Sequence, residues 1–131
     1  MERSNIPAKR ILVVDDEPYV CDALRMMLSI DGHEVTTASS ARQGLDLLAQ
    51  QPFDLVITDY SMPAMKGDEF ASLVKARNPA QPVVMITAYA EMLSGSKTGG
   101  LPCIDVLISK PFRLEQLRQA VARVLGLEKT P

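Results

Sequence analysis

The stretch ILVVDDEP, residues 11–18, decides the fold. Four aliphatic residues without alternation are typical of a strand that is covered on both faces of a parallel sheet. Three acidic residues follow at once, and Pro18 then suits the first position of a helix. Crowded carboxylates repel one another, which raises their pKa values and destabilises a fold. These acids therefore need a compensating positive charge.

Four more short apolar runs follow along the chain. They are EVTTA at 34–38, DLVIT at 54–58, PVVMIT at 82–87 and DVLIS at 105–109. Apolar residues at helical spacing occupy 20–28, 41–48, 70–74 and 114–124. Gly32 is placed to end the first helix, and Ser40 with Gln43 predicts a capping box for the second. Strands alternating with helices predict a doubly wound α/β fold with a five-stranded parallel sheet.

The connection before the last strand differs from the others. Residues 88–104 read AYAEMLSGSKTGGLPCI, with three glycines and a proline after a short helical start. Each glycine costs a helix about 1 kcal/mol and a proline about 3 kcal/mol. We therefore expect the fourth helix to be short or irregular. The GSKTGG segment is not a phosphate-binding loop, because Ser96 stands where that motif requires glycine before Lys97.

Length and composition indicate one globular domain. The chain has 131 residues and a net charge of −2, without the basic face and interleaved aromatics of a nucleic-acid-binding domain. It shows neither a signal sequence nor an apolar run of about 20 residues, so we expect no membrane partner and a cytoplasmic protein. Cys21 and Cys103 are expected to be free, buried thiols. We expect residues 9–126 to form the domain, with tails at 1–8 and 127–131 and no second domain.

Polar residues with complementary chemistry follow the predicted strands. In an open parallel sheet, ligands bind beyond the carboxyl ends of the strands. Those positions hold Asp15 and Asp16, Asp59, Thr87 and Lys110. Carboxylate oxygens at one edge are suited to Mg²⁺, which would supply the missing positive charge.

The same residues suggest phosphoryl transfer. A carboxylate such as Asp59 can accept a phosphoryl group to form an aspartyl phosphate. Charge on the transferred oxygens would be stabilised by the metal ion, by the ammonium of Lys110 and by a hydrogen bond from Thr87. An isolated aspartate at a strand end is more often a turn residue or a helix cap. The complementary set, taken together, favours function.

Four segments together resemble the receiver domain of two-component response regulators: ILVVDDEP, DLVITDYSMPAMKG, VVMITAYA and LISKPF. The resemblance covers roughly residues 9 to 126 and implies a flavodoxin-like fold with strand order 2-1-3-4-5. It implies that Asp59 is the phosphoacceptor and that Thr87 and Lys110 contact the phosphoryl group. It also implies a Mg²⁺ site of Asp15, Asp16, Asp59 and the Ser61 carbonyl, with Asp16 the more direct ligand of the acidic pair.

The resemblance further implies partners and a mode of action. A sensor histidine kinase or a phosphotransfer protein would donate the phosphoryl group, and a separate protein target would receive the signal. The chain would phosphorylate and dephosphorylate itself without being a turnover enzyme. Pro63 and Gly67 match the loop after the acceptor, and the Lys110–Pro111 peptide is often cis in this family.

One departure leaves an alternative open. Many receivers carry an aromatic residue three positions before the lysine, and here that residue is Leu107. Leu107 and the glycine-rich fourth crossover favour a non-switching pseudo-receiver that acts as a protein-binding module. A haloacid-dehalogenase-type hydrolase would require a second aspartate at position 61, which is serine. A flavin carrier would require a phosphate loop after the first strand.

Other polar residues near these motifs have simpler interpretations. We expect Glu17 to be a first-turn charge favoured by the helix dipole and not a metal ligand. We expect His33 to be solvated, and Met26 and Met27 to pack in the core. Four other aspartates are expected to be surface or cap residues: Asp31, Asp46, Asp54 and Asp68.

Overall fold

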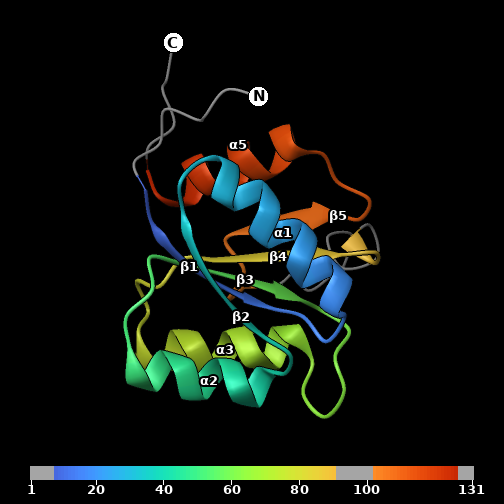
Figure 1. Cartoon of the computed structure of the whole chain (residues 1–131). Coiled ribbons are helices and arrows are strands. Elements are labelled where there is room, and N and C mark those ends of the chain that lie inside the picture. The colour runs from blue at the N-terminus through green and yellow to red at the C-terminus, as the bar shows by residue number, and fades with distance from the viewer. Residues whose placement is uncertain (1–7, 91–101, 127–131) are drawn as a thin grey trace.

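A computed structural model describes residues 8–90 and 102–126 of the chain (Figure 1). The strands are β1 (Arg10–Val14), β2 (Glu34–Ala38), β3 (Leu55–Asp59), β4 (Val83–Thr87) and β5 (Val106–Ser109). The helices in these ranges are α1 (Pro18–Ile30), α2 (Ala41–Gln50), α3 (Gly67–Arg77) and α5 (Leu114–Val124). The five strands form one parallel sheet in the order β2-β1-β3-β4-β5, which confirms the predicted fold and strand order.

Helices cover both faces of the sheet (Figure 1). In β1, Ile11 and Val13 face a core that includes residues of α1 and α5, whereas Leu12 and Val14 face a core with α2 and α3. All four side chains are completely buried. An apolar run without alternation is therefore needed, because each successive residue enters one of two apolar layers.

Strand register brings the carboxyl ends of the strands to one edge. Val14 pairs with Thr58, Asp59 pairs with Ile86, and Thr87 pairs with Ser109. The residues that end β3 and β4, or follow β1 and β5, therefore lie side by side at that edge.

Local signals in the sequence are confirmed at several helix ends. Pro18 is the first residue of α1, and Gly32 takes a positive φ of 82° in the turn after α1. The Ser40 hydroxyl accepts a hydrogen bond from the Gln43 amide at 3.1 Å and caps α2. The Gln43 side chain accepts from the Ser39 amide, one residue before the expected partner.

Two polar side chains in the turn between α1 and β2 are buried. Asp31 is 2% exposed and accepts hydrogen bonds from the Arg118 guanidinium of α5 at 2.7 and 2.8 Å. His33 is also buried, and its Nδ1 accepts from the Lys9 amide at 3.0 Å. Asp31 is the C-cap of α1, which agrees with the expected surface or cap role in its second form, although it is not at the surface. The prediction of a solvated His33 is wrong, because α5 covers this turn from a distant part of the chain. Asp46 and Asp54 are exposed, as expected.

Three further expectations have different outcomes. Met27 packs against the core, but Met26 is exposed, so the prediction of a packed Met26 is wrong. Both cysteines are free, with Cys21 buried and Cys103 only partly so. The predicted irregular fourth helix falls largely on residues 91–101, which lie outside the described residues.

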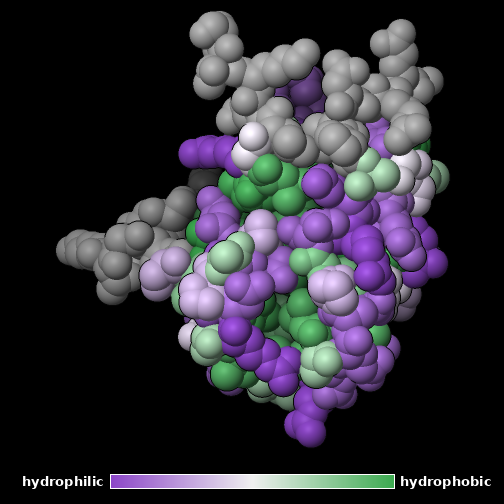
Figure 2. Space-filling model, turned by 90° about the vertical axis from the view of Figure 1, so that its left-hand side faces the viewer, coloured by the Kyte–Doolittle hydropathy of each residue, from purple (hydrophilic) through white to green (hydrophobic). Residues whose placement is uncertain are grey.

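The molecular surface at the amino ends of the strands is mostly hydrophilic. Figure 2 shows this side, where a hydrophobic patch lies in a hollow between hydrophilic side chains. Among the residues described, no helix is both long enough and apolar enough to cross a bilayer.

The partly buried Asp31–Arg118 pair should contribute to stability. Arg118→Met would leave the Asp31 carboxylate without its bidentate guanidinium partner, so we expect the free energy of unfolding to fall by about 2–3 kcal/mol. Urea denaturation measures this loss, and Arg123→Met, an exposed change on the same helix, is the control. Adding Asp31→Asn should recover part of the loss, because an amide carries no charge that the guanidinium has to balance. A loss no larger than that of the control would contradict the prediction.

Candidate functional site

Three acidic side chains meet at the carboxyl edge of the sheet. Asp15 directly follows β1, Asp59 ends β3, and Glu17 immediately precedes α1. Each contributes a carboxylate oxygen to a group whose members lie within 4.8 Å of one another. Asp15 and Asp59 are buried, with side chains only 3% and 6% exposed, whereas the Glu17 side chain is 40% exposed. The group is therefore a pocket with two acids inside and one at its mouth.

The ammonium of Lys110 lies among these carboxylates. Its Nζ is 3.4 Å from Asp15, 3.4 Å from Asp59 and 3.9 Å from Glu17. The Lys110 amide also donates to the Thr87 carbonyl at 2.9 Å, which fixes the lysine backbone against the end of β4. In this structure the positive charge required by the acidic sequence comes from Lys110, which follows β5, and β3 and β4 lie between β5 and β1.

The pKa values of these groups reflect burial and mutual charge. Burial raises the pKa of Asp15, and the Glu17 amide and Lys110 only partly oppose that shift. Burial likewise raises the pKa of Asp59 against the opposing effect of Lys110. Burial alone would lower the pKa of Lys110, but Asp15 and Asp59 together raise it. The pocket therefore holds a firmly protonated lysine beside carboxylates that ionise at some cost to the fold.

Glu17 was missed as a site residue. It is the N-cap of α1, but its side chain makes no capping hydrogen bond. One carboxylate oxygen lies near Lys110, and the other accepts a hydrogen bond from the Tyr19 hydroxyl. The prediction of a first-turn charge is therefore wrong in position, since Glu17 precedes the first turn.

Asp16 and Ser61 are less central than the resemblance implies. Within the described part of the chain, the tight group is formed by Asp15, Glu17 and Asp59. Asp16 is partly exposed, yet its charge is near enough to raise the pKa of Asp59. Ser61 is partly exposed on the loop two residues after Asp59. The predicted metal-binding roles of Asp16 and Ser61 stay predictions.

Thr87 occupies the neighbouring strand end. It is completely buried, and its hydroxyl oxygen accepts a hydrogen bond from the Tyr89 amide at 3.1 Å. The register places Thr87 one residue beyond the partner of Asp59. Thr87 is thus at the predicted edge, and within residues 8–90 and 102–126 its hydroxyl acts as an acceptor, which leaves its proton for a further acceptor.

The loop after β3 requires glycine where α3 begins. The Gly67 amide donates to the Tyr60 carbonyl at 2.8 Å, and a Cβ at this position would lie 2.1 Å from the Asp59 carbonyl oxygen. Any larger residue would push this turn away from the strand end that carries Asp59. The Lys110–Pro111 peptide is cis, as the resemblance implies.

Comparison with known proteins agrees with this geometry. The family model of the response regulator receiver domain matches residues 11–122. The chain belongs to the response regulator receiver domain family. It is 35% identical over 116 residues to the response regulator protein FleR of Pseudomonas aeruginosa, covering 88% of this chain and 24% of that protein. The receiver spans between about a quarter and about half the length of the curated relatives it matches.

Solved structures give the same result. The chemotaxis response regulator CheY4 of Vibrio cholerae is similar with a TM-score of 0.81 and 30% identity, covering 91% of this receiver and 100% of that chain. The response regulator TrrA of Thermotoga maritima, solved in complex with Mg(2+)-BeF, has a TM-score of 0.80 and 32% identity, covering 89% and 99%. The described residues therefore have the fold of these solved response regulators.

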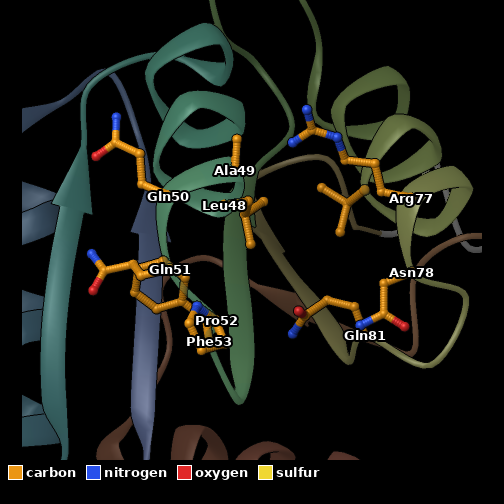
Figure 3. Close-up of a pocket in the computed structure, with 10 residues that line it drawn as sticks. Leu48, Ala49, Gln50, Gln51, Pro52, Phe53, Arg77, Asn78 and Gln81 are labelled. Atoms are coloured by element: carbon orange, nitrogen blue, oxygen red, sulfur yellow. The ribbon is translucent and has the colours of Figure 1, made fainter.

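A separate cavity of about 380 Å³ lies at the opposite end of the strands. Leu48 and Phe53 line one side of it, and Arg77 and Gln81 line the other (Figure 3). Val74 of α3 also belongs to its lining. Its lining contains no carboxylate and a single charged residue, Arg77. It is distant from Asp59 in the fold and does not share the chemistry of the acidic pocket.

The acidic pocket should reduce the stability of the receiver. A carboxyl with a raised pKa binds its proton more tightly in the folded state, so ionised Asp59 costs stability as the pH rises through its folded pKa. We expect Asp59→Asn to raise the free energy of unfolding at pH 7 by on the order of 1 kcal/mol. The gain should shrink as the pH falls and vanish below 3.8, the ordinary pKa of an aspartate side chain.

Denaturation at several pH values, without divalent cations, measures this gain. Asp46→Asn is a matched control, because Asp46 is exposed on α2 and makes only a long surface ion pair with Arg42. An Asp59→Asn variant that is less stable than wild type at pH 7 would show that ionised Asp59 supports the fold.

Proposed function

We propose that this receiver accepts a phosphoryl group on Asp59 from the phosphohistidine of a sensor histidine kinase or a phosphotransfer protein. One observation supports this most strongly: the buried Asp59 carboxylate lies 3.4 Å from the Lys110 ammonium at the carboxyl edge of the sheet. A nucleophile and a cation able to stabilise a phosphoryl group are thus already side by side.

The transfer is a substitution at phosphorus. An Asp59 carboxylate oxygen forms the new O–P bond while the P–N bond to the donor imidazole breaks, and the electron pair of that bond goes to the imidazole nitrogen. Lys110 stabilises charge on the phosphoryl oxygens, and Thr87 donates its hydroxyl proton to one of them. The product is an aspartyl phosphate, which hydrolysis returns to the carboxylate and inorganic phosphate.

The donor set of the pocket fits a hard divalent cation. Asp15 and Asp59 each bring a buried carboxylate to the group. Mg²⁺ prefers carboxylate oxygens together with water and carbonyl oxygens. Asp15 and Asp59 would hold it, and by the family resemblance Asp16 and the Ser61 carbonyl would complete the site. When bound, it would neutralise charge on the pocket and on the incoming phosphoryl group.

The phosphorylated receiver then passes the signal to a downstream protein target. This role is one of signalling, with one phosphoryl group accepted per cycle, and not turnover of a substrate. The curated relatives are about two to four times as long as this chain. We therefore propose only the class of each partner: a histidine kinase or phosphotransfer protein as donor, and a protein as target.

Phosphorylation in vitro tests the proposal. With Mg²⁺ and acetyl phosphate, wild type should gain one phosphoryl group by intact mass, Asp59→Ala should gain none, and the exposed control Asp46→Ala should behave as wild type. Omitting Mg²⁺ should abolish labelling. An unlabelled wild type would favour the non-switching pseudo-receiver, and labelling that survives in Asp59→Ala would place the acceptor elsewhere.

A further inference from the structure

Glu17 and Tyr19 form a pair at the mouth of the acidic pocket. The Tyr19 hydroxyl donates to Glu17 Oε2, while Glu17 Oε1 lies 3.9 Å from the Lys110 ammonium. The two oxygens of one carboxylate are thus divided between a hydroxyl outside the pocket and a cation inside it. Neither residue was assigned to the site from the sequence, and neither is needed to form the Asp59–Lys110 contact.

The backbone of Glu17 starts α1, and its side chain is not used to cap that helix. The carbonyl of Glu17 accepts from the amides of Val20 and Cys21 at 3.1 and 3.2 Å, so the backbone starts α1. Its amide donates to Asp15 Oδ1 at 2.9 Å, which ties it to the pocket. The side chain makes no capping bond, although this is the usual use of a polar N-cap.

Exposure orders the three acids from inside to outside. Asp15 and Asp59 are almost completely buried, Lys110 is 20% exposed and Glu17 is 40% exposed. An anionic donor approaching Asp59 therefore meets Glu17 before it meets the inner groups. Glu17 also neutralises part of the Lys110 charge, which would otherwise attract that donor.

We propose that Glu17, held by Tyr19, determines which phosphoryl donors this receiver accepts by penalising them in proportion to their negative charge. This inference rests on the proposed function, because it concerns entry to the Asp59 site. Among the described residues Glu17 pairs with Lys110 at 3.9 Å and not with Asp59, so we place its effect on donor binding and not on the transfer step.

Two small donors of different charge test the idea. Acetyl phosphate is a dianion at pH 7.5, whereas phosphoramidate carries a net charge of −1. At saturating Mg²⁺, Glu17→Gln should raise kphos/KM for acetyl phosphate about fivefold and for phosphoramidate about twofold, through KM, with kphos unchanged. The difference should shrink in high salt, which screens exposed charges.

Two further variants show whether the effect depends on where Glu17 is held or only on the net charge of the protein. Tyr19→Phe removes the hydroxyl that holds Glu17, so it should change kphos/KM in the same direction but less, and have no effect in the Glu17→Gln background. Glu34→Gln removes the same charge from an exposed residue at the amino edge of the sheet and should change neither donor. Circular dichroism confirms that each variant is folded.

The outcomes distinguish this inference from the proposed function. A wild type that neither donor labels at Asp59 contradicts the proposed function. Suppose that wild type is labelled at Asp59. If the ratio of kphos/KM for acetyl phosphate to kphos/KM for phosphoramidate is then the same in Glu17→Gln as in wild type and Glu34→Gln, the donor-selection role of Glu17 is wrong. A full Tyr19→Phe effect in the Glu17→Gln background would show that Tyr19 does not act through Glu17.

Discussion

The crowding of carboxylates around one ammonium is the interaction on which the site depends. Asp15 and Asp59 come from adjacent parallel strands, and Lys110 reaches both at 3.4 Å from beyond the edge strand. Two buried negative charges could not persist there unpaired, and burial still raises both pKa values in spite of the lysine. The pocket is therefore stable enough to form, yet retains an excess of negative charge that a cation or an electrophilic phosphorus can satisfy.

The fold keeps this arrangement in place through rigid, distant contacts. The strands that carry the site are buried on both faces, so their ends are fixed by two apolar cores. The Gly67 turn packs directly on the Asp59 backbone, and the Lys110 amide bonds to the end of β4. Far from the site, the Asp31–Arg118 pair joins the turn after α1 to α5. Stability that the acids remove at one edge is thus supplied by packing and pairing elsewhere.

Much of this was predictable, and what was missed has a common cause. The strands followed from apolar runs, and the meeting of Asp15, Asp59 and Lys110 followed from the rule that parallel strands end at one edge. The strand order came from the family resemblance. The burial of Asp31 depends on Arg118, which lies 87 positions away, and local sequence gives no sign of that pairing. Glu17 was misjudged because the helix dipole alone explains an acidic residue at the start of a helix. Its contact with Lys110 forms only when the chain folds and β5 joins the sheet.

The most direct test of the central claim is the stability of Lys110→Met as a function of pH. If Lys110 compensates the strand-end carboxylates, the variant should be less stable than wild type at pH 7 by on the order of 1 kcal/mol. The deficit should close as the pH falls through the raised pKa values of Asp15 and Asp59, because protonated acids no longer need the ammonium. A variant as stable as wild type at pH 7, or a deficit that persists undiminished at low pH, would contradict the account.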